Sequence, residues 1–326
     1  MYDKIGQRIV DFCMVNPPVL NYCCPFDSVC KWRVYMCTCD RDYPYALMSL
    51  WCLHQFCKPG SYVVELIDGG LSYDNYKRLI ELFPFVVPSA MDIIKPDASS
   101  GDRLNSTYWD YQWKMMQDGL SIKEPYFAHM GSDFIVLEDV LEKSEFLLKK
   151  KEGAQVSSCE YYERKYIACH FDQTVTGLGV WDDVVTLLSD NGTIDLIEEF
   201  FPSFWETINV RKYMWVAVNS GMELFSARKL AELLDPLILE VLDANRNKLP
   251  FWCDLTPFLL AYEKSIPHIR VTHETHCRLS PALIFDSVLS SYGSHYWKAI
   301  HRINRSKLVA EMVLDYMRTF YRQICY

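Results

Sequence analysis

The stretch SYVVELIDGGLSYDNYKRLIELFPFVVP, residues 61–88, decides the fold class of this protein. SYVVELID is apolar and rich in β-branched and aromatic residues, which predicts a buried strand that ends at the turn Gly69-Gly70. Ser72 is a favourable N-cap, and apolar residues recur behind it at helical spacing. PFVVP then predicts a second short strand. A strand, a helix and a strand in this order are typical of a parallel sheet that helices cover.

The same order occurs just before this stretch. WRVYMCTC, residues 32–39, predicts a buried strand. DYPYALMSLWCLHQFC, residues 42–57, predicts a helix with Pro44 in its first turn, where proline is tolerated. Together the two stretches give a β-α-β-α-β arrangement, and we therefore expect an α/β protein.

Beyond these elements the pattern is less regular. YFAHMGSDFIVLED predicts a strand that is interrupted at Gly131-Ser132-Asp133. We further expect a helix at 107–117, strands at 162–172 and 268–276, a strand–turn–strand at 211–226, helices at 227–247 and 249–265, and one or two amphipathic helices at 294–326.

The composition favours one compact unit. The chain has 326 residues, half of them hydrophobic, which is enough to bury a large core. We expect an N-terminal extension at 1–30, a main domain at 31–280 and a C-terminal helical segment at 281–326. The net charge of −9 disfavours nucleic acid as a partner.

The distribution of charged residues and cysteines bears on the compartment. The start MYDKIGQRIVDFCMV carries charges throughout, and no stretch reaches the roughly 18 apolar residues that cross a bilayer. We therefore expect a cytoplasmic protein without a membrane span. The 13 cysteines are odd in number and many lie in apolar segments, which favours buried thiols over disulfides. The early cysteines lack a paired C-x2-C spacing, so no zinc site is expected.

Ligands of open α/β sheets bind beyond the carboxyl ends of the strands. The residues that follow the predicted strands are therefore the candidates for a functional site. In this chain they are residues 38–42, 68–70, 131–133 and 219–221.

Five motifs follow one another in an order that resembles a known family. They are VYMCTCDRDYPYALMSLWCLHQF, VVELIDGGLSYDNYKRLIELFP, YFAHMGSDFIVL, MWVAVNSGMELFS and LPFWCDLTPFLLAY. Their layout, between residues 32 and 280, is similar to that of nucleotide-diphospho-sugar glycosyltransferases of the GT-A type, in particular family-eight-like enzymes. The resemblance implies a Rossmann-like mixed sheet flanked by helices. It also implies transfer of a hexose from a UDP-linked donor to a hydroxyl group on a glycan, a protein or a small molecule.

The resemblance implies donor-binding roles for residues at the first two strand ends. Thr38, Cys39, Asp40 and Arg41 correspond to the residues that hold the base and ribose. Asp68 corresponds to an acid near the ribose or the metal, although only one of the two acids of that family turn is present.

The resemblance also implies a metal site for Mn or Mg. The metal-binding D-x-D motif of the family corresponds to Gly131-Ser132-Asp133, so its first acid is missing here. Asp133 is then the expected metal ligand, Ser132 lies beside the donor, and His276 completes the metal shell. The chemistry fits this role, because a divalent cation held by a carboxylate neutralises the charge that develops on a leaving diphosphate.

Three further residues correspond to the sugar pocket of the family. Asn219 and Gly221 match an N-x-G turn, in which asparagine bonds to sugar hydroxyls and glycine permits close approach of the backbone. Asp254 corresponds to a helix start that faces the sugar, where Leu255 replaces the glutamine of the family. We expect Asn219 and Asp254 to be the catalytic residues.

Each of these roles has a structural alternative. Asp133 also suits a solvated turn, Asn219 an ordinary hairpin and Asp254 a helix N-cap. The departures at Gly131 and Leu255 leave open a GT-A-fold protein that binds a nucleotide sugar or a partner without turnover. A metal-independent transferase, in which cationic side chains and helix N-termini stabilise the phosphate, is also open. Dinucleotide-binding, P-loop and hydrolase classes are disfavoured, because their glycine-rich and nucleophile motifs are absent.

Overall fold

The computed structural model of this chain describes residues 2–17, 30–93, 111, 114–153, 155–159, 199, 202–203, 222–233, 264, 268–275, 296–301, 303 and 307–325. Its helices and strands are, in chain order, α1 (Lys4–Val15), β1 (Trp32–Thr38), α2 (Tyr43–Phe56), β2 (Tyr62–Asp68), α3 (Tyr73–Leu82), β3 (Val86–Pro88), β4 (Tyr126–Met130), β5 (Ile135–Val136), α5 (Val140–Lys151), β6 (Gln155–Cys159), β7 (Met222–Ser226), α9 (Ala227–Leu233), β8 (His268–Thr275), β9 (Tyr296–His301) and α13 (Lys307–Cys325).

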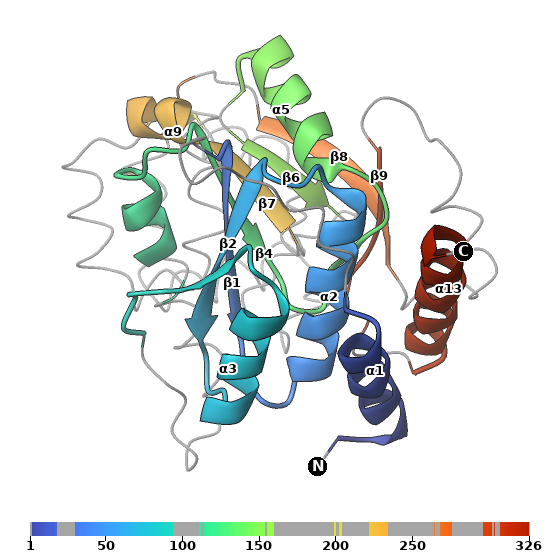
Figure 1. Cartoon of the computed structure of the whole chain (residues 1–326). Helices are drawn as coiled ribbons and strands as arrows, with labels where there is room; N and C mark the ends of the chain where they lie inside the picture. The colour runs from blue at the N-terminus through green and yellow to red at the C-terminus, as the bar shows by residue number, and fades with distance from the viewer. Residues whose placement is uncertain are drawn as a thin grey trace, which may run out of the picture.

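The described strands form one sheet in the order β3-β2-β1-β4-β7-β6-β8-β9-β5 (Figure 1). β1 pairs in parallel with β2 and β4, β2 with β3, and β8 with β6 and β9. β7 runs antiparallel to β4 and β6, and β5 runs antiparallel to β9. The sheet is mixed and mostly parallel, helices flank it, and α13 lies at the carboxyl-terminal end of the described chain. The predicted α/β class is confirmed.

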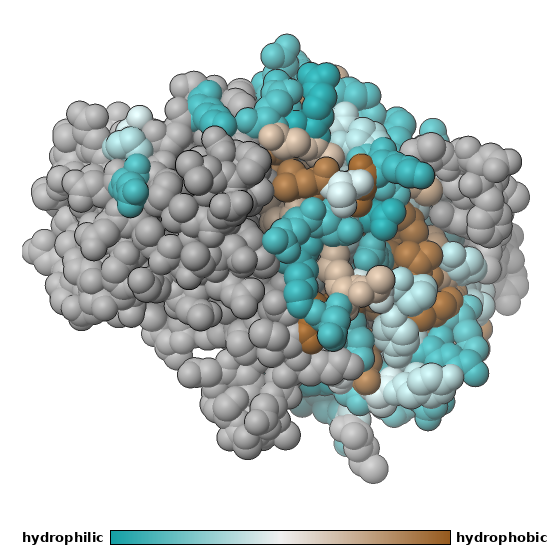
Figure 2. All heavy atoms as spheres, turned by 90° about the vertical axis from the view of Figure 1, so that its left-hand side faces the viewer, coloured by the Kyte–Doolittle hydropathy of each residue, from teal (hydrophilic) through white to brown (hydrophobic). Residues whose placement is uncertain are grey.

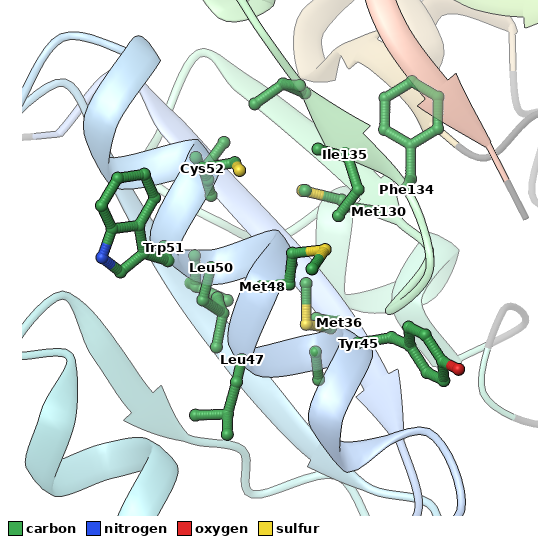
Figure 3. Packing of buried hydrophobic residues seen from close by; sticks show 14 of the residues in the cluster. Met36, Tyr45, Leu47, Met48, Leu50, Trp51, Cys52, Met130, Phe134 and Ile135 are labelled. Carbon is green, nitrogen blue, oxygen red and sulfur yellow. The ribbon is translucent and has the colours of Figure 1, made fainter. Parts of the chain in front are cut away.

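One face of the central strands is apolar and packs against α2, which in turn contacts α1 and α13. Val34 and Met36 of β1, Leu66 of β2 and Met130 of β4 are buried in this cluster. α2 is buried along nearly its whole length, which is the pattern of a helix that lies between two layers. Figure 3 shows Met48 of α2 close to Met36 of β1. This packing holds the start of α2 against the carboxyl end of β1.

The opposite face of the same strands is charged. The Arg33 guanidinium on β1 forms ion pairs with Glu65 on β2, at 2.9 Å, and with Glu124, at 3.0 Å. The Tyr35 hydroxyl donates a hydrogen bond to Asp118 at 2.5 Å. Successive side chains of a strand point to opposite faces, which separates these polar residues from the apolar ones between them.

The end of the chain differs from the helices expected at 294–326. Tyr296–His301 is strand β9, which pairs with β8 and β5, and the helix covers Lys307–Cys325. Ala299 and Ile300 on β9 are fully buried. Six residues are too few for the apolar pattern to separate a strand from a helix, and the pairing partners are far away in the sequence.

The residues expected to form an N-terminal extension contribute α1 to the core. Asp3 caps this helix, because its Oδ1 accepts a hydrogen bond from the Gly6 nitrogen at 2.9 Å. The Phe12 ring packs edge-on against Trp51 of α2, with the centroids 5.9 Å apart. The elements α1, α5 and β6 were not among those expected from the sequence. The domain boundaries themselves stay predictions.

Of the free cysteines in the described ranges, Cys13, Cys52 and Cys57 are buried, as expected, whereas Cys30, Cys37 and Cys39 are half-buried. Burial raises the pKa of the Cys13, Cys52 and Cys57 thiols, so they stay protonated at neutral pH.

The exposed large hydrophobic side chains of the described residues are distributed over α1, α3, α5 and α13. Figure 2 shows hydrophilic and hydrophobic residues intermingled on the side at the left of Figure 1. These exposed side chains are Met14, Val15, Tyr73, Phe146 and Leu308. None of the helices in the described part of the chain has the length and apolar character needed to cross a membrane.

Candidate functional site

The carboxyl ends of β1, β2 and β4 lie at one edge of the sheet. Thr38, the last residue of β1, is paired with Asp68, the last residue of β2. Tyr35 is paired with His129, one residue before the end of β4, so the turn that follows β4 reaches the same edge. The ends of these strands and their turns therefore bring three of the predicted segments together, as ligand sites in such sheets require.

The loop after β1 and the turn after β2 are bonded to each other. The Asp40 nitrogen donates to the Gly70 carbonyl at 3.2 Å, and the Gly69 nitrogen donates to the Thr38 carbonyl at 2.9 Å. A Cβ atom on Gly69 would lie 2.8 Å from the Cys37 sulfur. The absence of a side chain at this glycine is what lets the two segments approach.

The Asp68 carboxylate shapes its own turn. Its Oδ1 accepts hydrogen bonds from the backbone nitrogens of Gly70, at 2.9 Å, and Leu71, at 2.7 Å. Gly70 has a φ of +115°, a conformation that glycine adopts at no steric cost. Asp68 thus fixes the shape of the turn after β2. The donor-binding role predicted for it remains a separate prediction.

The Asp40 carboxylate connects the loop after β1 to the start of α3. Its Oδ1 accepts hydrogen bonds from the Ser72 nitrogen at 2.8 Å, the Ser72 hydroxyl at 3.0 Å and the Asn75 side chain at 2.8 Å. Desolvation raises the pKa of Asp40, but the hydrogen bonds from Ser72 and Asn75 outweigh it, and the net pKa lies below the ordinary value. Asp40 is therefore an ionised acceptor at the edge of the sheet.

Arg41 supplies a positive charge beside Asp40. Its guanidinium donates to the Asp42 carboxylate at 2.7 Å and 3.2 Å, and the arginine side chain remains 63% exposed. The pKa of Arg41 is raised mainly by these bonds to Asp42 and, to a smaller extent, by the negative charge of Asp133. The turn after β4 therefore lies within electrostatic reach of the loop after β1.

The turn at Gly131-Ser132-Asp133 is held from both sides. The Phe134 nitrogen donates to the Gly131 carbonyl at 3.1 Å, and the Ile303 nitrogen donates to the Asp133 carbonyl at 3.2 Å. Ser132 and Asp133 are half-buried. Their side chains thus stand on a fixed backbone at the edge of the sheet.

The described residues do not form a metal centre by themselves. Within the described ranges no group of three or more His, Cys, Asp or Glu side chains is placed to hold a metal ion. The negative charge of Asp133 contributes to the raised pKa of Arg41, so a metal at this carboxylate would lie near a second cation. Asn219, Gly221, Asp254 and His276 lie outside the described residues, and their roles stay predictions.

Asn75 and Tyr2 belong to this region although no sequence pattern pointed to them. Asn75 binds the Asp40 carboxylate and the Tyr2 hydroxyl, at 2.8 Å and 2.7 Å. Ser72 occupies the N-cap position as expected, but its side chain makes no capping bond and donates to Asp40. The N-cap pattern located Ser72, whereas no local signal marks Asn75 or Tyr2 as neighbours of Asp40.

No protein-family model and no curated protein matches this sequence. Solved structures similar to it include mouse xyloside xylosyltransferase 1 in its apo form, at 13% identity and a TM-score of 0.47, with 85% of this chain and 99% of that chain covered. The galactosyltransferase LgtC in complex with donor and acceptor sugar analogs is 9% identical, with a TM-score of 0.45 and coverage of 87% and 95%. The bifunctional glycosyltransferase WbbM is 12% identical, with a TM-score of 0.41 and coverage of 85% and 46%. These likenesses are distant.

Proposed function

We propose that this protein is a glycosyltransferase that moves a hexose from a UDP-linked donor to a hydroxyl group on a glycan, a protein or a small molecule. The observation that supports this function best is the meeting of three strand-end segments at one edge of the sheet. These segments carry the Asp40 carboxylate, which accepts hydrogen bonds, the Arg41 guanidinium and the half-buried turn of Asp133 at the same edge of the sheet. A nucleoside needs hydrogen-bond partners and a diphosphate needs positive charge, and this edge offers both.

The nucleoside would bind at the loop after β1. An ionised carboxylate accepts hydrogen bonds only, so Asp40 suits the N–H of a base or the hydroxyls of ribose. Thr38 and Cys39 precede it on the same edge and would contact the same part of the donor. Asp68 fixes the neighbouring turn through its bonds to the Gly70 and Leu71 nitrogens.

The diphosphate would lie between Arg41 and the turn that carries Ser132 and Asp133. As the bond between sugar and phosphate breaks, negative charge grows on the diphosphate, and a nearby guanidinium stabilises that charge. Arg41 is held in place by Asp42 while most of its side chain remains accessible to a ligand. The Ser132 hydroxyl would donate to a phosphate oxygen.

The remaining predicted residues would bind the metal ion and the sugar. Asp133 and His276 are the proposed ligands of Mn or Mg, although the described residues alone do not fit a metal centre. Asn219 and Asp254 would hold the sugar hydroxyls and orient the reacting carbon, and Gly221 would let the backbone approach the sugar.

Thermal melting with a panel of nucleotides and nucleotide sugars tests the function. A ligand that binds only the native state raises the melting temperature by mass action. We expect UDP and one UDP-sugar to raise it, and GDP, ADP and CMP to have no effect. Release of UDP from that UDP-sugar would then separate a transferase from a protein that binds without turnover. No shift with any nucleotide would refute the proposed site.

A further inference from the structure

Tyr2, a residue outside the predicted site, is linked to it through Asn75. The Asn75 Nδ2 atom donates one hydrogen bond to Oδ1 of Asp40 at 2.8 Å and another to the Tyr2 hydroxyl at 2.7 Å. Asp40 lies in the loop after β1, Asn75 in the first turn of α3, and Tyr2 ahead of α1. Three separate segments of the chain thus meet in one short chain of hydrogen bonds.

The chemistry of these groups allows one orientation of the Asn75 amide. An ionised carboxylate only accepts, so the amide nitrogen, and not the amide oxygen, must face Asp40. The second proton of that nitrogen then points to the phenol oxygen of Tyr2, which accepts it. Both donors of the amide are used, and any rotation of Asn75 would break both bonds.

Tyr2 is itself held against the core. Its ring stacks on that of Tyr43, with centroids 5.8 Å apart and an angle of 19° between the planes. Tyr43 is fully buried at the start of α2. The Tyr2 hydroxyl is therefore a fixed acceptor rather than a freely rotating surface group.

The bonds to Asp40 all reach one of its two oxygens. The Ser72 nitrogen, the Ser72 hydroxyl and the Asn75 amide donate to Oδ1. Within the described residues, Oδ2 receives none of these bonds. The rotation of the carboxylate is thus restricted, and one acceptor oxygen remains for a ligand.

We propose that Tyr2 and Asn75 are positioning residues that hold the Asp40 carboxylate ready for the nucleoside of the donor. The inference rests on the proposed function, in which Asp40 is the nucleoside-binding acid. Tyr2 and Asn75 act through Asp40. By restricting the carboxylate before the ligand arrives, they reduce the conformational entropy lost on binding.

The test compares UDP binding by the wild-type protein with that of Tyr2→Phe and Asn75→Ala, measured by calorimetry. Tyr2→Phe keeps the ring that stacks on Tyr43 and removes only the acceptor oxygen. Tyr73→Phe is the matched control, because it removes a hydroxyl from the same helix as Asn75 at a side chain that is 78% exposed.

We expect UDP to bind about two- to tenfold more weakly to Tyr2→Phe, the range set by one hydrogen bond, and at least as weakly to Asn75→Ala. Tyr73→Phe should bind as the wild type does. In UDP-sugar hydrolysis the KM of Tyr2→Phe and of Asn75→Ala should rise by the factor by which UDP binding weakens, and kcat should not change. A general loss of structure does not raise KM alone.

Equal UDP affinity for the wild type, Tyr2→Phe and Asn75→Ala would overturn the positioning role and leave the proposed function standing. An equal loss in Tyr73→Phe, or a fall in kcat at constant KM, would overturn it as well. If the wild type itself binds no UDP, the proposed function fails and this inference with it. If Asn75→Ala does not fold, the UDP affinity of Tyr2→Phe alone decides between these outcomes.

Discussion

Gly69 donates its backbone N–H to the Thr38 carbonyl at 2.9 Å, and this contact joins the turn after β2 to the end of β1. The approach is so close that a Cβ atom on Gly69 would lie 2.9 Å from the Thr38 oxygen and 2.8 Å from the Cys37 sulfur. The shape of the candidate site thus depends on the absence of one side chain.

Gly69→Ala should destabilise the protein and weaken its binding of UDP. The new methyl group meets a backbone oxygen that cannot move without breaking the pairing of β1 and β2, and such overpacking costs about 1–3 kcal/mol. Urea unfolding measures the loss. The double variant Cys37→Ala/Gly69→Ala removes the contact with sulfur but not that with the carbonyl, so it should recover only part of the stability. Full recovery would show that the sulfur alone causes the strain.

Arg33→Met should be strongly destabilising. The Glu65 and Glu124 carboxylates are nearly buried, and without Arg33 both would lose the counter-charge that they share. Removing one partner of a buried ion pair costs about 3 kcal/mol or more. Arg318→Met is the control, since its pair with Asp315 is exposed and such pairs contribute about 1 kcal/mol at most. Similar losses in both variants, measured by urea unfolding, would contradict this account of the charged face.

Asp133→Ala should reduce sugar transfer by about 100-fold or more, if the carboxylate acts on the developing charge of the diphosphate. The melting temperature should change little, because the side chain is half-buried and the turn is held by backbone bonds. Asp11→Ala, on the exposed side of α1, should leave transfer unchanged. Unaltered transfer in Asp133→Ala would remove the residue from the site.

A titration of the wild type with Mn tests the metal role of Asp133 separately. If the cation takes part, it should raise both the affinity for UDP and the rate of transfer, and both gains should be smaller in Asp133→Ala. An Mn titration that changes neither quantity would leave Asp133 without a metal and Arg41 as the main source of positive charge.

His129 should make the stability of the protein depend on pH between about 4 and about 6.5. Burial lowers the pKa of His129 to about 4, from an ordinary value of 6.5. In this range the unfolded chain binds a proton that the native protein does not, so stability is present above the range and is lost as the pH falls. Between pH 7 and pH 5 the wild type should lose about 2 kcal/mol more than His129→Phe, as urea unfolding would show. Equal losses would contradict the burial of a neutral histidine.

Local patterns were sufficient for much of the fold. Short apolar segments rich in β-branched and aromatic residues predicted β1, β2, β3, β4 and β8, and helical spacing predicted α2 and α3, because these patterns are properties of a few neighbouring residues. The strand β9 was expected as helix, since a short apolar segment fits both periods and its pairing with β8 and β5 decides between them.

The sequence by itself determined the α/β class and the strand ends at which a ligand site was expected, because parallel strands place their carboxyl ends at one edge. The tertiary structure alone decided which side chains meet there. Asn75 lies 35 residues from Asp40 and 73 from Tyr2, and no local period relates positions so far apart. Contacts of this kind depend on how α1 and α3 pack around the sheet, and it is they that orient the Asp40 carboxylate.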